Sequence, residues 1–277
     1  MDPLSLLWFY FILASLQPVF QRQILFLRRR SALSSISRAR GATVITLIHR
    51  QETMSLFGFP LVRYIDIDDS EGVLRAIRDT PPEQPIEIIL HTPGGLVLAA
   101  QQIAGALADH PGKVTAVVPH YAMSGGTLIS LAADVIVVDA HSVLGPVDPQ
   151  LDRFPAASLV AVAAMPGEHD DQTLIMADVG RKAIMQVQAF VERTLVERLG
   201  PERARDAARL LATGVWTHDH PLTATDLGSI GLKISVGVPP AERGLMELYP
   251  QPRGRTPAVE YYAGDGRGPA APAPGGS

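Results

Sequence analysis

The 277-residue sequence contains no cysteine. This absence excludes disulfide bonds, metal sites built from thiolates and a cysteine nucleophile. The side chains that remain for covalent catalysis are those of Ser, Thr, Lys, Asp, Glu, His and Tyr. Any nucleophile in this chain is therefore a hydroxyl, an amine, a carboxylate or an imidazole.

Lysine is scarce as well, because only Lys113, Lys182 and Lys233 occur beside 21 arginines. Wherever a surface needs positive charge alone, this sequence uses arginine. Arginine keeps its proton near neutral pH, whereas a lysine in a desolvated environment can lose it. A lysine inside the folded region is therefore a candidate for acid–base chemistry, although an ordinary surface role is the commoner one.

The sequence also lacks an excess of positive charge, since its formal net charge is −4 at pH 7 and its pI is near 6.1. No stripe of basic residues interleaved with aromatic ones is present, so nucleic acid is not expected as a partner. The apolar fraction of 47% is ordinary for a globular protein. At this length the chain can bury one substantial core, as one domain or two small ones.

Charged residues are absent from Pro3 to Gln21, and most of this stretch is apolar. As a helix it would be roughly 28 Å long at about 1.5 Å per residue, close to the roughly 30 Å of a bilayer core. We therefore predict a transmembrane or membrane-anchoring helix over residues 1–27. Gln17 and Pro18 leave a second interpretation open, a hydrophobic helix packed on the domain or lying in the membrane interface.

Basic residues follow this apolar stretch and do not precede it, since Arg22 and Arg28–Arg30 come after it. A cleaved signal peptide carries its basic residues first, so we expect the segment to stay attached. By the positive-inside tendency the Arg-rich side and the catalytic domain would lie in the cytoplasm. Residues 28–42 are predicted to form a basic juxtamembrane linker.

Between residues 43 and 250 short apolar runs typical of buried strands alternate with helical patterns. Strands and helices alternating at this spacing imply βα crossovers and a mainly parallel sheet, that is, an α/β domain. Residues 251–277 are rich in Pro, Gly and Ala and are expected to be disordered. The predicted strands are 43–49, 64–67, 86–90, 114–118 and 135–138, and the clearest helical regions are 96–107, 125–133 and 171–211.

Two glycine-bearing turns, His91–Gly95 and His120–Thr127, each follow a predicted strand and precede a predicted helix. In a parallel sheet both turns emerge at the C-terminal edge, where open α/β sheets bind ligands. Ser124 would then lie at a helix N-terminus, beside backbone N–H groups without intrahelical partners. An oxyanion formed there could accept hydrogen bonds from the N–H groups of Gly125 and Gly95.

Each motif also has an ordinary structural interpretation. A Ser-Gly-Gly sequence is often a helix N-cap, and a Pro-Gly-Gly sequence is often a tight turn. His218–His220 brings two histidines and a carboxylate close together, but no further ligand is evident, so no metal site is predicted. Asp148 is interpreted as a residue that makes hydrogen bonds within its turn.

Four motifs together resemble the serine dehydrogenase proteinase family, which is part of the wider class of Clp proteases and signal-peptide peptidases. The resemblance runs from about Thr43 to Pro250 and implies a Clp/crotonase-like superhelical fold of repeated βα units, peptidase activity and homo-oligomers formed through the helical layer. No Gly-x-Gly-x-x-Gly fingerprint follows a strand, so neither dehydrogenase activity nor a cofactor is expected. The motifs are residues 91–95, 122–127, 144–150 and 216–219.

The general base is taken from the same resemblance. In Clp proteases it is a histidine after the nucleophile's helix, but this sequence has Gly145 or Pro146 near that position. Signal-peptide peptidases use a downstream lysine, for which Lys182 is the candidate here. A lysine accepts a proton only where partial burial lowers its pKa toward neutrality. Ser142 could orient the lysine amine.

The sequence therefore predicts a membrane-anchored serine peptidase that uses Ser124 and Lys182 to cleave peptides or membrane proteins. A crotonase-like acyl-thioester enzyme on the same fold remains an alternative, because paired N–H donors would serve it equally well. A non-catalytic scaffold that forms oligomers at the membrane is the third possibility.

Overall fold

The computed structural model describes residues 3–49 and 63–249 of the chain. The tail predicted to be disordered, residues 251–277, lies outside these residues. Five parallel strands form the central sheet in the order β1-β2-β3-β5-β9. The α/β class and the parallel sheet predicted from the sequence are therefore confirmed. These strands are β1 (Thr43–Ile48), β2 (Ile86–His91), β3 (Val114–Val118), β5 (Val135–Val138) and β9 (Ile234–Val236).

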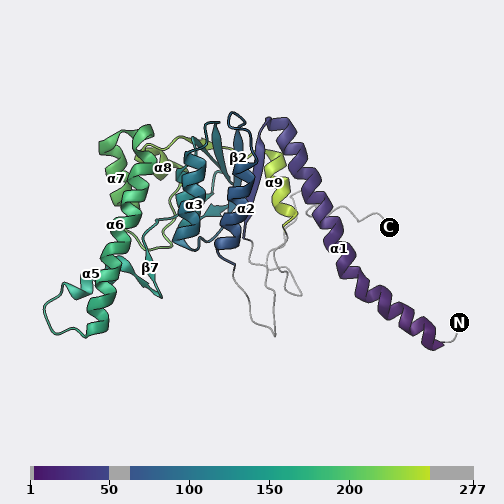
Figure 1. The fold of residues 1–277 in the computed structure, drawn as a ribbon, viewed down its shortest axis with the longest axis horizontal. Coiled ribbons are helices and arrows are strands. Elements are labelled where there is room, and N and C mark those ends of the chain that lie inside the picture. The colour runs from purple at the N-terminus through teal and green to yellow at the C-terminus, as the bar shows by residue number, and fades with distance from the viewer. Residues whose placement is uncertain (1–2, 50–62, 250–277) are drawn as a thin grey trace, which may run out of the picture.

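One face of the sheet is covered by the helices that connect the strands (Figure 1). The main core lies here, where apolar side chains of β2 and β3 meet those of α3 and α4. Burial of branched apolar side chains on both sides is typical of parallel strands, and every residue of β2 is buried. The helices are α2 (Ile67–Arg78), α3 (Val97–Ala108), α4 (Gly125–Leu131) and α8 (Ala224–Ile230).

The helical region predicted over residues 171–211 consists of two helices, α6 (Asp171–Leu199) and α7 (Pro201–Ala212). Gly200 ends α6 with a φ of 78°, a conformation that glycine adopts without a steric penalty. The chain then restarts with a proline, which favours the first turn of a helix. Helix α6 packs between α5 (Ala156–Ala163) and α7 and also contacts α3 and α4.

The opposite face of the sheet is covered by α9 (Pro240–Glu247) and by the C-terminal part of α1 (Pro3–Arg40). Ile36 of α1 is buried there against Ile89, Val117 and Leu245. Helix α1 continues through residues 28–40, which the sequence analysis assigned to a linker. Figure 1 shows the N-terminal part of α1 extending beyond the rest of the molecule.

Within the part of the chain that the structure describes, no helix combines the length and the apolarity needed to cross a bilayer. The transmembrane helix predicted over residues 1–27 is therefore not supported. The C-terminal end of α1, beyond residue 27, belongs to the folded domain. Arg29 donates to the Leu248 carbonyl (2.7 Å), and Arg40 pairs with Glu242 (2.7 Å).

Short pairings complete the C-terminal edge of the sheet, where the two glycine-bearing turns lie. β4 (Tyr121–Ala122) pairs with β6 (Val143–Leu144), and Thr92 forms a bridge to Ala122. The strand predicted over residues 64–67 is reduced to one bridge between Ile65 and Gly95, because α2 begins at Ile67. A two-stranded hairpin, β7 (Gln150–Leu151) with β8 (Phe154–Pro155), precedes α5.

Candidate functional site

Ser124 lies in the turn between β4 and α4. Its backbone has φ 50° and ψ −111°, outside the regions that a residue with a Cβ normally adopts. Such a conformation costs on the order of 1–3 kcal/mol and persists only where the surroundings enforce it. As the N-cap of α4, Ser124 makes no side-chain capping bond to the described backbone. Its hydroxyl is therefore not used in the N-cap role that the sequence had left open.

The Gly94–Gly95 turn lies directly against Ser124. A Cβ added to Gly94 would lie 2.8 Å from the Cβ of Ser124 and 3.0 Å from the Met123 carbonyl oxygen. Real Cβ atoms do not approach other heavy atoms this closely, so a side chain at Gly94 would push the two turns apart. Gly94 also has a φ of 105°, which glycine adopts readily. The two turns predicted to meet at one edge of the sheet do so.

Two main-chain amides lie beside Ser124 in this arrangement. The Gly125 N–H is the first of helix α4, where N–H groups have no partner within the helix. The Gly95 nitrogen lies 3.5 Å from the position that a Cβ on Gly125 would occupy. The main-chain nitrogens of Gly95 and Gly125 therefore lie close together, next to Ser124.

Gly145 is held against the same end of α4. Its N–H donates to Thr127 Oγ1 (3.1 Å), one turn along the helix from Ser124. A Cβ on Gly145 would lie 2.5 Å from Met123 Cε and 3.7 Å from the His218 carbonyl oxygen. The loop that carries His218 therefore packs next to the turn that carries Met123 and Ser124.

His218 forms an imidazole–carboxylate pair with Asp148. The His218 Nδ1 and Asp148 Oδ1 atoms are 2.8 Å apart, and the exposed fractions of the two side chains are 32% and 2%. Gln150 Nε2 donates to the second carboxylate oxygen of Asp148 at 2.7 Å. A buried carboxylate thus holds one ring nitrogen of a partly exposed histidine in place.

The sequence analysis missed this pair, because it had treated the two residues separately. Asp148 was interpreted as a turn residue and His218 as a weak metal candidate. Among the described residues no cluster of three or more ligand side chains could hold a metal ion. His220 stacks instead on Trp216, with ring centroids 5.1 Å apart.

Lys182 lies on the surface of α6. Its amine is paired with the Asp178 carboxylate one turn earlier, and its side chain is 62% exposed. The hydrogen bond from Lys182 lowers the pKa of the Asp178 carboxyl. In the described part of the chain no hydrogen bond joins Lys182 to Ser124.

Ser142 closes a turn at the end of β5. Its hydroxyl oxygen accepts the Asp139 N–H at 3.0 Å, and its own N–H donates to the Asp139 carbonyl at 3.1 Å. These bonds are typical of a serine that stabilises a local turn. The orienting role toward Lys182 suggested for Ser142 remains a prediction.

Two solved structures share part of this architecture. ClpP1 from Listeria monocytogenes aligns over 73% of this chain and 94% of its own, with 15% identity and a TM-score of 0.42. A mutant of the 1510-N membrane-bound stomatin-specific protease aligns over 74% of this chain and 82% of its own, with 18% identity and a TM-score of 0.46.

Two relatives from Methanocaldococcus jannaschii are much more similar in sequence. The uncharacterized protein MJ0137 is 50% identical over 272 residues, which cover 94% of either chain. The uncharacterized protein MJ1495 is 46% identical over 263 residues, which cover 94% of this chain and 90% of the relative.

Residues 1–268 match a single family of serine proteinases. The match includes both glycine-bearing turns and the segments that carry Asp148 and His218. The family resemblance recognised from the four sequence motifs is thereby confirmed. The chain belongs to the ClpP-like SDH-type serine proteinases.

Proposed function

We propose that this protein is a serine peptidase in which Ser124 is the nucleophile. The N–H groups of Gly95 and Gly125 stabilise the oxyanion of the tetrahedral intermediate. The observation that carries this proposal is the close packing of the Gly94–Gly95 turn against Ser124, which has a strained backbone. Strain of this kind is characteristic of functional turns that hold a side chain in one exposed orientation.

His218 is the general base in this proposal, and Asp148 orients it. Nε2 of His218 accepts the hydroxyl proton as Ser124 Oγ bonds to the carbonyl carbon of the substrate. When the C–N bond breaks, the same proton passes to the leaving amine, and an acyl-enzyme remains on Ser124. Water then loses a proton to His218 and attacks the ester carbonyl carbon, and as the C–O bond to Ser124 breaks, His218 returns that proton to Ser124 Oγ and the acid is released.

His218 replaces Lys182 in this role for a physical reason. A base must be neutral and within reach of the hydroxyl, whereas the Lys182 amine is exposed and paired with Asp178. The His218 loop packs on Gly145 beside Met123, the neighbour of the nucleophile. Asp148 also favours the imidazolium that forms during the reaction.

Peptides are the proposed substrates, as the family assignment suggests. The Gly94–Gly95 turn, called here the oxyanion turn, is followed directly by Leu96, Val97 and Leu98. All three side chains are exposed. An apolar surface at this position would contact side chains next to the scissile bond of an extended peptide. Contact with non-reacting parts of the substrate helps to hold its carbonyl near the nucleophile.

The experiment that tests the proposal is labelling of the full-length chain with a fluorophosphonate probe, which reacts only with activated serines. We expect labelling of wild type, none of Ser124→Ala, and at least a hundred-fold slower labelling of His218→Gln. Lys182→Ala should be labelled at the wild-type rate with an unchanged Tm, since its exposed ion pair contributes little.

Three outcomes would contradict parts of this assignment. If wild-type protein is folded by circular dichroism but is not labelled, the proposal of a serine hydrolase is wrong. An acyl-thioester enzyme or a non-catalytic scaffold is then favoured. Stabilisation of that protein by acyl-CoA in a thermal-shift assay would select the acyl-thioester enzyme. Slow labelling of Lys182→Ala together with normal labelling of His218→Gln would return the role of base to the lysine.

Membrane association and self-association belong to the same proposal. Trp8, Phe20 and Ile24 of α1 are exposed. An apolar helix surface of this kind can bind in the interfacial region of a bilayer. On α6, Leu174, Ile175 and Val179 are also exposed, and they offer a contact for a second copy of the chain. We expect co-flotation with liposomes, which Trp8→Glu with Phe20→Glu should abolish.

A further inference from the structure

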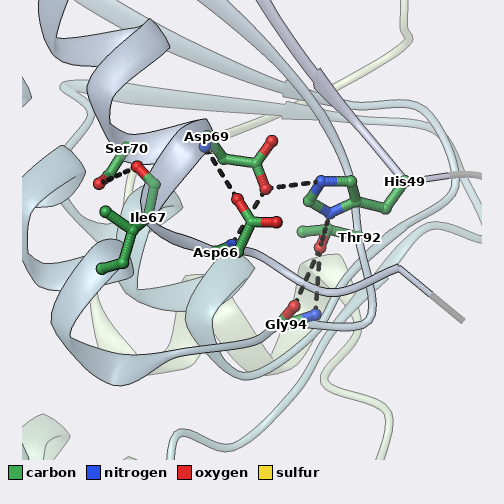
Figure 2. A network of polar contacts seen from close by, with 7 residues as sticks. All are labelled: His49, Asp66, Ile67, Asp69, Ser70, Thr92 and Gly94. Atoms are coloured by element: carbon green, nitrogen blue, oxygen red, sulfur yellow. Dashed lines mark hydrogen bonds and ion pairs between the residues drawn. The ribbon is translucent and has the colours of Figure 1, made fainter.

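A second group of polar side chains lies beneath the oxyanion turn, and the proposed mechanism does not use it (Figure 2). His49 follows the end of β1, Asp69 lies in the first turn of α2, and Thr92 follows the end of β2. His49 Nε2 is 3.0 Å from Asp69 Oδ2, and His49 Nδ1 is 3.0 Å from Thr92 Oγ1. These contacts link Asp69, His49 and Thr92 in a continuous series of hydrogen bonds. The three residues are called here the Thr92 relay.

The Thr92 relay has the order of a catalytic triad but cannot act as one. Thr92 is fully buried, with 0% exposure, so its hydroxyl cannot reach a substrate carbonyl. The Thr92 hydroxyl contacts Gly94 instead, whose N–H donates to Oγ1 at 3.1 Å. The Gly94 carbonyl oxygen lies 3.4 Å from the same Oγ1. The series of hydrogen bonds in the Thr92 relay therefore ends on the backbone of the oxyanion turn.

Asp69 determines the direction of the hydrogen bonds in the Thr92 relay. Burial alone would raise the pKa of the Asp69 carboxyl, but hydrogen bonds from His49 and from the Asp66 N–H outweigh burial and lower it. An ionised carboxylate only accepts hydrogen bonds, so the proton of His49 resides on Nε2. In the neutral ring Nδ1 is then an acceptor for the Thr92 hydroxyl, whose oxygen accepts the Gly94 N–H.

The planar peptide unit links the hydrogen bonds of Gly94 to the direction of the Gly95 N–H, the proposed oxyanion donor. In a planar trans peptide the carbonyl of Gly94 and the N–H of Gly95 point in opposite directions. The Gly94 carbonyl oxygen accepts the Ile65 N–H at 2.8 Å, while Thr92 holds the Gly94 N–H. Both peptide planes around Gly94 are thus fixed, and so is the direction of the Gly95 N–H.

A Gly-Gly turn needs such fixation because its own backbone has little preference. Without Cβ atoms, Gly94 and Gly95 can rotate to conformations that turn the Gly95 N–H away from Ser124. A larger residue cannot supply the rigidity, since a Cβ on Gly95 would lie 2.3 Å from the Ile65 nitrogen. The restraint has to come from partners outside the turn.

We propose that Asp69, His49 and Thr92 are positioning residues that keep the Gly95 N–H directed at the oxyanion formed on Ser124. Asp69 acts at two points, because its Oδ2 also accepts the N–H of Asp66 at 3.0 Å. Asp66 follows Ile65, the residue that holds the Gly94 carbonyl. This inference rests on the proposed peptidase function and assigns these three residues to the same site.

The test compares Thr92→Val, which removes the hydroxyl at constant shape, with Thr92→Ser, which restores it. With the fluorophosphonate probe we expect labelling of Ser124 to slow ten- to hundred-fold in Thr92→Val and by less than threefold in Thr92→Ser. On a fluorogenic peptide the loss should appear in kcat, with KM nearly unchanged, since the oxyanion exists only in the transition state.

Thr80→Val is the matched control. Thr80 is also a buried threonine, and its hydroxyl donates to the Ala76 carbonyl at 2.7 Å, outside the oxyanion turn. A purely structural effect would slow labelling equally in Thr80→Val and Thr92→Val for an equal change in Tm. Normal labelling of Thr92→Val, or equal slowing in the two variants, would overturn the relay.

Two further measurements separate the relay from the proposed function. In 15N-glycine-labelled protein, the Gly95 amide resonance should move in Thr92→Val and Asp69→Asn but not in Thr80→Val, whether or not Ser124 reacts. An unmoved resonance overturns the relay, whereas a moved resonance in a wild type that cannot be labelled overturns only the peptidase. The activity losses of Asp69→Asn and Thr92→Val should combine to less than their product in the double variant, because the two substitutions share the hydrogen bonds through His49.

Discussion

The two faces of the sheet each carry a buried polar group, and the two groups differ in how well they are satisfied. On the side covered by α2 and α3, the hydrogen bonds of the Thr92 relay link three side chains to the backbone. On the opposite side, Glu87 of β2 and Glu242 of α9 are buried together beside Arg40 of α1. Glu87 Oε1 and Glu242 Oε2 have no hydrogen-bond partner among the described residues.

The difference shows in the protonation of the two groups. Burial first, and then the charge of Glu242, raises the pKa of Glu87 to about 7, although Arg40 acts in the opposite direction. In the Thr92 relay, hydrogen bonds to the Asp69 carboxylate outweigh burial and lower its pKa. A network with a complete set of donors keeps its charge, whereas two carboxylates that share one partly exposed cation favour binding a proton.

The largest effect is expected when the shared cation is removed. Arg40→Met leaves two buried carboxylates without a counter-charge, a situation that costs about 3 kcal/mol or more. We expect the free energy of unfolding to fall by about 3 kcal/mol at pH 8 and by clearly less at pH 5.5, where Glu87 is protonated. Urea denaturation at the two pH values measures the difference.

Arg38→Met is the matched control for this substitution. Arg38 lies on the same helix, but its hydrogen bond to Ser34 is exposed, so its removal should change stability by less than about 0.5 kcal/mol. Equal losses at both pH values for Arg40→Met would show that Arg40 acts through packing of α1, independently of the two carboxylates.

A smaller effect is expected from neutralising one carboxylate. The pKa of Glu87 is raised to about 7 in the folded protein from its ordinary value of 4.5, so the group binds protons more tightly when folded. Its contribution to stability is complete below about pH 4.5 and is lost as pH rises through about 7. Glu87→Gln should therefore be more stable than wild type at pH 8.5, and its stability should decrease much less as pH rises.

The measurement is a series of thermal unfolding curves between pH 5 and pH 9 on both proteins. Glu87→Gln should leave fluorophosphonate labelling of Ser124 unchanged, since its network lies on the far face of the sheet. If the Tm of wild type and of Glu87→Gln changed equally with pH, the loss of stability at alkaline pH would not be due to Glu87.

The sequence predicted correctly that the two glycine-bearing turns meet, because chain order determines their position. A strand followed by a helix in a parallel sheet must end at one edge, so the turns after β2 and β3 meet there. The same reasoning could have found one part of the Thr92 relay. In the parallel pairing Ile48 lies opposite His91, which makes His49 a neighbour of Thr92.

The remaining parts depend on packing that periodicity does not encode. His218 and Asp148 are 70 positions apart and meet only because the loop before α8 folds back onto the edge of the sheet. Lys182 was chosen through resemblance to lysine-dependent peptidases, and nothing in its local pattern decides whether α6 presents it to Ser124 or to solvent. The extent of α1 was missed because its arginine-rich end packs against α9 through arginine side chains, which a hydropathy pattern assigns to a linker.

The smallest stability effect is expected in the Thr92 relay, with the opposite pH dependence. Because the pKa of Asp69 is lowered on folding, its contribution is present above its normal pKa and is lost as pH falls through the folded value. Asp69→Asn should therefore lose about 1–2 kcal/mol near pH 7, as expected for a hydrogen bond to a charged group, and progressively less toward pH 3. Urea denaturation of both variants between pH 3 and pH 9 should separate two losses of stability. Asp69→Asn should reduce the loss at acid pH, and Glu87→Gln should reduce the loss at alkaline pH. If Asp69→Asn instead reduced the loss of stability at alkaline pH, the two polar groups would be coupled through β2. The Thr92 relay and the carboxylate pair would then not be independent.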